Sequence, residues 1–378
     1  MIYFDNAATT RILPEVIEEM NKSFEEHWGN PSSTHRQGQK SRAAIEKSRE
    51  TIVKWLQVDT KEIIFTSGGA ESNNLILRGA LKVNESKGKH LITSKIEHST
   101  VLKTCQALEK EGYEVTYIDV TERGVIDPEQ LKNAIRNDTV AISVMYVNNE
   151  TGVVQPIDEI AKMIEGKGIV LHTDAIQGVG KEMILPKKQG IHALSAAAHK
   201  FYGPKGTGFL YLDQNYMIEK EITGGSQERN RRSGTENVHG IVGMAKALEI
   251  VYSDMEEEQA KEKEMQIYLE EALKEEICNI KINCGNSRRI SSVVNITLED
   301  CNVQTLMVAL DMEGICVSGG SACMSGAMET SHVLKAMGAS EEDLKSSIRV
   351  SIGRYNTKDE IDIFIQKLKE IVARERAK

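Results

Sequence analysis

A histidine and a lysine stand side by side where a small apolar segment ends. The segment Leu194-Ser-Ala-Ala-Ala leads into His199 and Lys200, and a Gly-Pro-Lys-Gly turn follows. Desolvation disfavours an ammonium, so a lysine at the end of a buried strand is shifted toward the free amine. A free amine can form a Schiff base, which makes Lys200 a candidate anchor for a carbonyl cofactor. The alternative is that both residues lie in an exposed turn.

Two further residues have chemistry that such a cofactor uses. Asp174 follows the predicted strand 168–172, and a buried carboxylate needs a partner. A pyridinium nitrogen would supply one, as in enzymes that use pyridoxal phosphate (PLP). His98, between a strand and a helix, could stack on the pyridine face and transfer protons. A salt bridge to an arginine is the alternative for Asp174, and a histidine without a role is the alternative for His98.

A glycine-rich loop offers a site for a single phosphate. The predicted strand 62–66 leads through Ser67-Gly-Gly-Ala70 into a predicted helix. Free backbone amides and the positive end of the helix dipole converge at such a point. The loop is neither a GxGxxG nor a Walker A pattern, so a nucleotide is not expected. The alternative is a simple tight turn.

Four more residues complete the candidate site. Asn149 and Gln177 are polar groups that follow strands and face the same rim, although either could merely cap a turn. Arg354 follows the predicted strand 348–352 and has the fork that binds an α-carboxylate. Cys323 lies in a loop of small residues without a periodic apolar pattern, so a reactive thiol explains it better than packing does.

An α/β framework is needed to bring these residues together. From residue 62 to residue 212, predicted strands alternate with predicted helices, which implies a mostly parallel sheet covered by helices on both faces. Ligands of such sheets bind beyond the carboxyl ends of the strands. The loop 67–70, the segment 147–150, Asp174 and the pair 199–200 all follow strands, so we expect them to surround one site.

The length of 378 residues, with 40% hydrophobic residues, predicts two domains. We expect residues 1–15 to join the small domain, residues 16–255 to form a large cofactor-binding domain, and residues 256–378 to form a smaller α/β domain that carries Cys323. A long, charged and helical stretch, from about 239 to 276, is expected to connect the two domains.

Composition and charge exclude several classes of partner. The chain has 47 Lys and Arg against 56 Asp and Glu, a net charge of −9, which argues against nucleic acid or an anionic membrane. Its apolar runs are too short to span a bilayer, and the N-terminus has no signal-peptide pattern. Its six cysteines have neither disulfide nor zinc spacing. We therefore expect a cytoplasmic protein without a metal.

With these residues assembled, the sequence resembles the PLP-dependent cysteine desulfurases of the NifS and IscS type, within the class-V aminotransferase group. The similar segments are Tyr3-Phe-Asp-Asn-Ala-Ala-Thr-Thr, Gly29-Asn-Pro-Ser-Ser, Phe65-Thr-Ser-Gly, Val147-Asn-Asn-Glu-Thr-Gly, His172-Thr-Asp-Ala-Ile-Gln, His199-Lys-Phe-Tyr-Gly-Pro-Lys-Gly, Arg232-Ser-Gly-Thr235 and Gly320-Ser-Ala-Cys-Met-Ser-Gly. The resemblance implies a PLP fold-type I architecture, PLP as the cofactor, L-cysteine as the substrate, and a homodimer.

The resemblance also implies a role for each matching residue. The implied cofactor contacts are Lys200 as covalent anchor, Asp174 at the pyridinium, His98 on the ring, Gln177 at the phenolic oxygen, Asn149 beside it, and Gly69, Ala70 and His199 at the phosphate. Thr235 would reach the phosphate bound in the partner subunit. Asn149 and Arg354 would hold the substrate carboxylate.

The implied reaction converts L-cysteine to L-alanine. Cysteine displaces Lys200 from the cofactor, Lys200 and His98 move protons, and the Cys323 thiolate attacks the substrate sulfur, which leaves a persulfide on Cys323. The long loop around Cys323 resembles the mobile-loop group of the family, which delivers sulfur to an acceptor, either an iron–sulfur scaffold or a tRNA-thiolation enzyme. Because the sequence ends at Lys378 without the long extension of some relatives, we expect a tRNA-thiolation enzyme or another sulfur carrier.

Two positions depart from the family pattern. Ala70 and Ala197 stand where the family usually has a threonine and a serine, whose hydroxyls bind the cofactor phosphate. A charge-assisted hydrogen bond is worth about 1.5 to 3 kcal/mol. We therefore expect weaker cofactor binding unless the amides at Gly69 and Ala70, together with His199 and Thr235, compensate.

The departures and the loop thiol leave two alternatives open. The first is another PLP enzyme on the same fold, such as a selenocysteine lyase or an aminotransferase, although an aminotransferase needs no loop thiol. The second is a non-catalytic member that binds a sulfur carrier.

Overall fold

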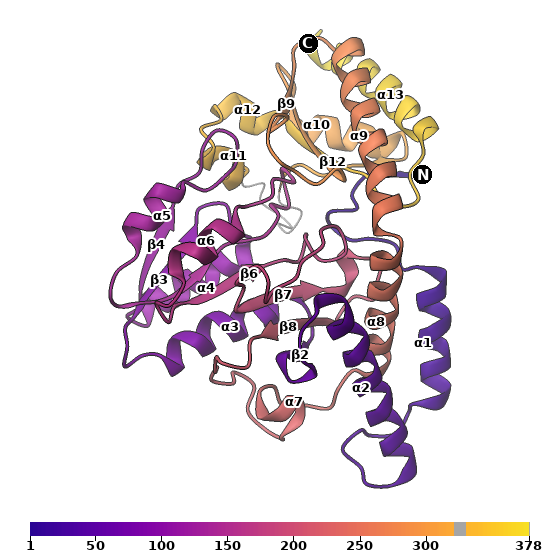
Figure 1. Ribbon diagram of the computed structural model, residues 1–378. Helices are drawn as coiled ribbons and strands as arrows, with labels where there is room; N and C mark the ends of the chain where they lie inside the picture. The colour runs from indigo at the N-terminus through magenta and orange to yellow at the C-terminus, as the bar shows by residue number, and fades with distance from the viewer. Residues whose placement is uncertain (321–329, 378) are drawn as a thin grey trace.

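The computed structural model describes residues 1–320 and 330–377. A large α/β unit, built on a seven-stranded sheet, occupies the lower part of Figure 1, and a smaller unit with a three-stranded sheet lies above it. Both chain termini lie in the smaller unit, and the helices α8 and α9 run along one side of the molecule from one unit to the other.

The large sheet has the strand order β2-β8-β7-β6-β5-β3-β4. Its strands are β2 (Ile63–Thr66), β3 (His90–Ser94), β4 (Glu114–Ile118), β5 (Thr139–Ser143), β6 (Val170–Asp174), β7 (Ala193–Ala197) and β8 (Gly208–Leu212). Neighbours pair in parallel, except that β8 is antiparallel to both β2 and β7. The predicted, mostly parallel sheet is therefore confirmed.

Helices cover both faces of this sheet. They are α1 (Pro14–Glu26), α2 (Arg36–Leu56), α3 (Gly69–Val83), α4 (Ser99–Lys110), α5 (Pro128–Ala134), α6 (Ile157–Ile164), the short α7 (Gln227–Asn230) and α8 (Val238–Ser253). Alternate strand residues point to opposite faces. Leu91 and Leu210 accordingly pack in the core beneath α3 and α4, whereas Ile92 and Phe209 pack in the core beneath α1, α2 and α8.

The smaller unit has its own apolar core. Its sheet has the antiparallel order β12-β10-β9, and a two-stranded piece pairs β1 with β11. Its elements are β1 (Ile2–Tyr3), α9 (Met255–Glu276), β9 (Ile280–Asn283), β10 (Val293–Leu298), α10 (Val303–Met312), β11 (Ile315–Cys316), α11 (His332–Ala336), α12 (Glu341–Lys345), β12 (Ser347–Ser351) and α13 (Lys358–Arg376). Ile2 and Phe4 share this core with α9, α10 and α13. The domain boundaries at residues 15 and 255 stay a prediction.

The stretch 239–276 is helical, as predicted. It forms two helices, α8 and α9, with a break at Asp254. The Asp254 amide still donates to Ile250 O at 3.0 Å, so it ends the first helix as a cap. The Asp254 side chain pairs with Arg354, a contact that lies 100 residues away in sequence and that no local pattern could reveal.

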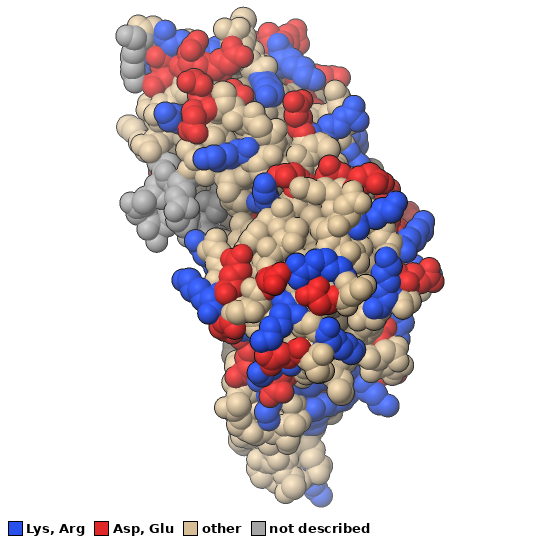
Figure 2. Space-filling model, turned by 90° about the vertical axis from the view of Figure 1, so that its left-hand side faces the viewer, with Lys and Arg blue, Asp and Glu red and all other residues tan. Residues whose placement is uncertain are grey.

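The surface carries charges of both signs. On the face shown in Figure 2, Lys and Arg side chains are interspersed with Asp and Glu side chains. No helix in the described residues is long and apolar enough to cross a membrane. Among the same residues, we find no group of three or more His, Cys, Asp or Glu side chains that could hold a metal ion.

Candidate active site

A cavity of about 570 Å³ opens at the carboxyl edge of the large sheet. The predicted residues in its lining are Gly69, Ala70, His98, Asn149, Asp174, Gln177, His199 and Lys200. They come from loops after five different strands, so the parallel sheet brings them together as expected. Thr235 is exposed and does not line the cavity, and Cys323 lies outside the described residues.

Lys200 ends the short 3₁₀ turn η2 (Ala198–Lys200), which directly follows β7. Its Nζ donates hydrogen bonds to two main-chain carbonyl oxygens of the N-terminal segment, Ala7 O at 2.7 Å and Ala8 O at 2.8 Å. These contacts hold the amine at the cavity wall. They also explain why residues distant in sequence from the sheet are needed to complete the site.

Asp174 is the last residue of β6 and is only 4% exposed. Its Oδ2 accepts a hydrogen bond from Asn73 Nδ2 at 2.7 Å, and its Oδ1 accepts one from the Ile176 amide at 3.1 Å. The same Asn73 Nδ2 lies 2.9 Å from Thr100 Oγ1. Asp174 is therefore a fixed, buried carboxylate at the cavity wall, suited to a cationic ring nitrogen.

Sequence analysis missed Asn73. It is buried on α3, four residues after Gly69, and it orients Asp174. The available signal was a polar residue in a helical stretch that is otherwise apolar on that face, because a buried amide requires partners.

His98 is the N-cap residue of α4. Its Nδ1 accepts a hydrogen bond from the Thr100 amide at 3.2 Å and lies 2.9 Å from the Thr100 hydroxyl. Because Nδ1 serves as an acceptor, the neutral ring carries its proton on Nε2. The cap therefore fixes both the orientation and the tautomer of a histidine at the cavity wall.

The glycine loop leads into α3 without a capping side chain. Gly68 is the N-cap at φ 148° and makes no side-chain cap hydrogen bond, so the first amides of α3 face the cavity at Gly69 and Ala70. Space at this turn is limited, because a Cβ at Gly69 would lie 2.0 Å from Ile176 Cδ1. The turn thus presents backbone donors to an anion in the way that a phosphate site requires.

His199 also lines the cavity. Burial, helped by the charges of Lys200 and Lys205, lowers its pKa to about 4. Its Nδ1 lies 3.2 Å from Thr9 Oγ1. The ring is therefore neutral at pH 7 and can donate a hydrogen bond to an anion rather than a full charge.

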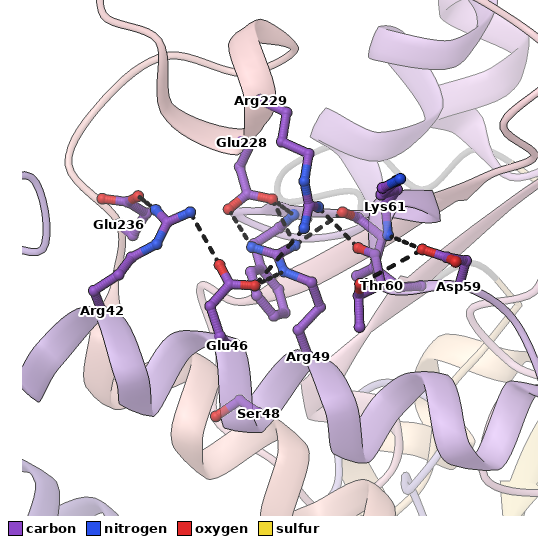
Figure 3. Close-up of polar contacts among 12 residues, drawn as sticks. Arg42, Glu46, Ser48, Arg49, Asp59, Thr60, Lys61, Glu228, Arg229 and Glu236 are labelled. Atoms are coloured by element: carbon purple, nitrogen blue, oxygen red, sulfur yellow. Dashed lines mark hydrogen bonds and ion pairs between the residues drawn. The ribbon is translucent and has the colours of Figure 1, made fainter. Parts of the chain in front are cut away.

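A buried ion pair supports the loop from behind. Arg49 and Glu228, 1% and 2% exposed, are joined by two hydrogen bonds of 2.9 Å (Figure 3). Arg49 also donates to Ile63 O at 2.8 Å, and Glu228 accepts from the Phe65 amide at 2.9 Å. The pair thus satisfies the free edge of β2, the strand that leads into the glycine loop.

The segment that follows Glu228 is held in an unusual conformation. Glu228, Arg229 and Asn230 all have positive φ, 47°, 56° and 64°. Such strain persists only where the surroundings fix it. Two residues later, Arg232 pairs with Glu71 at 2.7 Å, which ties this segment to the start of α3. Thr235, three residues beyond, is presented at the surface.

The structure places Arg354 away from the cavity. Its guanidinium pairs with Asp254 at 2.7 Å and with Glu258 at 3.3 Å. Arg349, from the middle of β12, lines the cavity instead. It donates to Asn149 O and to Asp5 Oδ1, both at 2.8 Å, and its buried Nε has no hydrogen-bond partner among the described residues.

Two residues that follow the segment of Cys323, Ser331 and His332, are held beside the cavity wall. The Ser331 hydroxyl donates to Glu150 Oε2 at 2.5 Å. His332 Nε2 lies 2.9 Å from the main-chain oxygen of Glu97. Glu150 follows β5 directly after Asn149, so the C-terminal anchor of the segment sits beside the cavity wall.

These residues fit PLP by the chemistry of the donor set. The cavity offers a primary amine for its aldehyde, a buried carboxylate for its ring nitrogen, and free amides at a helix start for its phosphate. Ala70 and Ala197 also line the cavity and add no hydroxyl to this donor set.

Comparison with known proteins agrees with this chemistry. The family model of the class-V aminotransferases matches residues 2–364. The chain therefore belongs to the class-V aminotransferase family, and it is a PLP-dependent enzyme.

Among individual relatives, the cysteine desulfurase IscS of Dictyoglomus turgidum is 43% identical over 375 residues, which cover 99% of this chain and 95% of that protein. A NifS-like protein of known structure is 36% identical with a TM-score of 0.93, over 98% of this chain and 99% of its own. SspA, solved in complex with cysteine, is 36% identical with a TM-score of 0.83, over 94% and 100%. These similarities confirm the predicted PLP fold-type I architecture and the resemblance to NifS and IscS proteins.

Proposed function

We propose that this chain is a cysteine desulfurase that takes sulfur from L-cysteine and passes it to an acceptor protein. The observation that carries the proposal is the joint presence of Lys200, Asp174 and His98 in one cavity. The names of the relatives, cysteine desulfurase IscS and NifS-like protein, support the same reaction. The relative solved with cysteine supports the substrate.

We assign the cavity residues as follows. Lys200 binds the cofactor aldehyde, Asp174 pairs with the ring nitrogen, His98 lies on the ring, Gln177 donates to the phenolic oxygen, Asn149 borders it, and Gly69, Ala70 and His199 bind the phosphate. Arg349, rather than Arg354, holds the substrate carboxylate, because its guanidinium lies in the cavity wall and Arg354 is engaged with two carboxylates elsewhere.

The bound cofactor supplies an electron sink that weakens bonds at the substrate carbon. The Lys200 amine would take up and return a proton at Nζ, and His98 would exchange one at Nε2. The Cys323 thiolate attacks the substrate sulfur. One C–S bond breaks and one S–S bond forms, so that L-cysteine and a thiol become L-alanine and a persulfide, with no other oxidant or reductant.

We also propose a homodimer with shared sites. Thr235 is exposed, and the segment that carries it is fixed by the Arg49–Glu228 pair. A residue that contacts the site of a partner subunit needs both this exposure and this fixed position. Two large apolar side chains, Phe24 on α1 and Trp28 just after it, are 53% and 70% exposed. An interface with a second copy of the chain would remove these side chains from water.

The acceptor and the location are part of the proposal. A persulfide carrier requires Cys323 in the thiol form, which the reducing cytoplasm maintains. Relatives named IscS favour an acceptor in iron–sulfur cluster assembly, and a tRNA-thiolation enzyme is the second class. Sulfur transfer from the loaded enzyme to purified candidates of each class would distinguish them.

The first experiment compares wild type with Cys323→Ala. We expect both proteins to bind PLP and to absorb in the visible range. With a thiol reductant added to release the persulfide sulfur, only the wild type should form alanine and sulfide from L-cysteine. Alanine production by Cys323→Ala would contradict the role of the thiol. Turnover of selenocysteine without turnover of cysteine would favour a selenocysteine lyase, and a colourless protein that stays inactive with added PLP would favour a non-catalytic sulfur-carrier-binding protein.

A further inference from the structure

The amide of Gln177 is held at both ends. Lys181 Nζ donates a hydrogen bond to Gln177 Oε1 at 2.8 Å, and Gln177 Nε2 donates to Ala7 O at 2.8 Å. An ammonium has donors only and a carbonyl oxygen accepts only. The oxygen and nitrogen of a side-chain amide are nearly alike in size and shape. Both contacts require the same orientation, with Oε1 toward Lys181 and Nε2 toward Ala7. One N–H of Gln177 Nε2 remains to serve the cavity that Gln177 lines.

Lys181 is placed by the turn that follows β6. The Val179 amide donates to Ala175 O at 2.8 Å, and the Lys181 amide donates to Gly178 O at 3.0 Å. Gly180 has φ 81°, and a Cβ there would lie 2.8 Å from Phe201 Cβ, so only glycine fits this turn. The turn therefore delivers Lys181 back toward Gln177.

Helix α9 secures Lys181 from the other unit. Gln259 Nε2 donates to Lys181 O at 2.6 Å. Burial lowers the pKa of Lys181, and the nearby Glu262 carboxylate opposes that shift. Burial likewise raises the pKa of Glu262. Burying an ammonium is unfavourable, so apolar packing does not explain a lysine at this position. The hydrogen bond from Lys181 to Gln177 does explain it.

We propose that Lys181 is a positioning residue that fixes the Gln177 amide so that an N–H, not the carbonyl oxygen, faces the phenolic oxygen of PLP. The inference rests on the proposed role of Gln177 at that oxygen. Lys181 itself does not line the cavity; it acts through Gln177, in the way that outer residues orient the ligands of a metal.

The expected consequence is spectroscopic. A donated hydrogen bond stabilises negative charge on the phenolic oxygen, which favours the less protonated form of the bound cofactor. Loss of the correctly oriented donor therefore raises the pH midpoint of the visible absorption band. A hydrogen bond to a charged group corresponds to a shift of about one pH unit.

The test titrates the visible band of the PLP-loaded protein against pH in four variants. Lys181→Met removes the donor and keeps the length, Lys181→Arg keeps donor and charge, Gln177→Leu removes the amide, and the double variant Lys181→Met with Gln177→Leu closes a cycle. Lys167→Met, at an exposed lysine, is the matched control. Thermal unfolding of each loaded protein verifies that it is folded.

We expect the midpoint to rise by about one unit in Lys181→Met and in Gln177→Leu, and to stay unchanged in Lys181→Arg and in the control. In the double variant, the lysine substitution should add nothing, because Lys181 acts through the amide. An unshifted midpoint in Lys181→Met, or additive shifts in the double variant, would overturn the inference. An unshifted midpoint in Gln177→Leu would instead refute the proposed role of Gln177, so the two failures are distinguishable.

Discussion

The two walls of the cavity are built in different ways. The wall from the large sheet places its groups directly after strands, and Asp174, Gln177 and Lys200 each make at least two hydrogen bonds that fix them. The wall from the smaller unit contributes Arg349 from the middle of β12, across the junction between the units. Strand order fixes the first wall, whereas the second depends on how the two units dock.

The largest expected effect tests which arginine belongs to the second wall. Arg349→Lys keeps the charge but loses the planar fork, so kcat/KM for L-cysteine should fall by about 10- to 100-fold, chiefly through KM. Arg354→Lys, five residues away, should leave kcat/KM within about twofold, because exposed or partly exposed ion pairs contribute little. Steady-state alanine release measures both.

A folding control is needed because Arg349 also holds Asn149 O and Asp5. Thermal unfolding and PLP content should be close to wild type in Arg349→Lys if the effect is on the substrate. A larger loss in Arg354→Lys than in Arg349→Lys would restore Arg354 as the carboxylate ligand and would show that the docking seen here is not the working one.

The same contrast explains what the sequence could and could not predict. The loops after β2, β5, β6 and β7 were predicted because parallel strands all end at one edge, and the sheet confirms this. Arg354 was chosen because it follows a strand, but a residue after β12 in a separate sheet need not reach the cavity. Arg349 carried a signal that was missed, since an arginine in the middle of a buried strand is rare unless it has partners.

Other contacts had no sequence signal. The break at Asp254 and the pairing of Asp254 with Arg354 join segments 100 residues apart. The Arg49–Glu228 pair spans 179 residues. Such pairs depend on tertiary packing. The predicted strand 62–66, in contrast, agrees with β2 to within one residue, because its apolar run and the glycine loop that follows it are local signals.

The second prediction concerns the phosphate end of the first wall. Ala70→Thr with Ala197→Ser should restore two hydroxyls, each worth about 1.5 to 3 kcal/mol at a charged partner. We expect each to tighten PLP binding by about 10-fold or more, measured as the dissociation constant by dialysis and absorbance. Ala70 is exposed and Ala197 is buried, so the threonine should be tolerated more readily than the serine.

The control for this pair is Ala43→Thr, a small-to-hydroxyl change on α2, outside the cavity lining. An unchanged dissociation constant in the double variant would mean that the backbone amides, His199 and Thr235 already satisfy the phosphate. The phosphate end of the first wall would then be complete without the two hydroxyls.

The last prediction concerns stability rather than activity, and it is made at Glu97, which has contacts in both walls. Its side chain is buried, Oε1 accepts from Ser94 Oγ at 2.5 Å and from the Met145 amide at 2.9 Å, and Oε2 has no partner among the described residues. Its main-chain oxygen lies 2.9 Å from His332 Nε2 of α11. Burial raises the pKa of Glu97 to about 8, so the folded protein keeps this proton at pH 7.

The sign of the pH effect follows from this proton. Between about pH 4.5 and 8 the unfolded chain releases it and the folded chain retains it, so rising pH destabilises the wild type by up to about 1.4 kcal/mol per pH unit at this site. Glu97→Gln keeps the shape of the side chain but does not titrate. The free energy of unfolding of the variant, relative to that of the wild type, should therefore increase as pH rises. His199, whose pKa is lowered, has the opposite dependence, but it is present in both proteins and cancels. Urea unfolding at pH 5, 6, 7 and 8 measures the difference. Parallel curves of unfolding free energy against pH would show that Glu97 is ionised in the folded state, which would contradict the prediction.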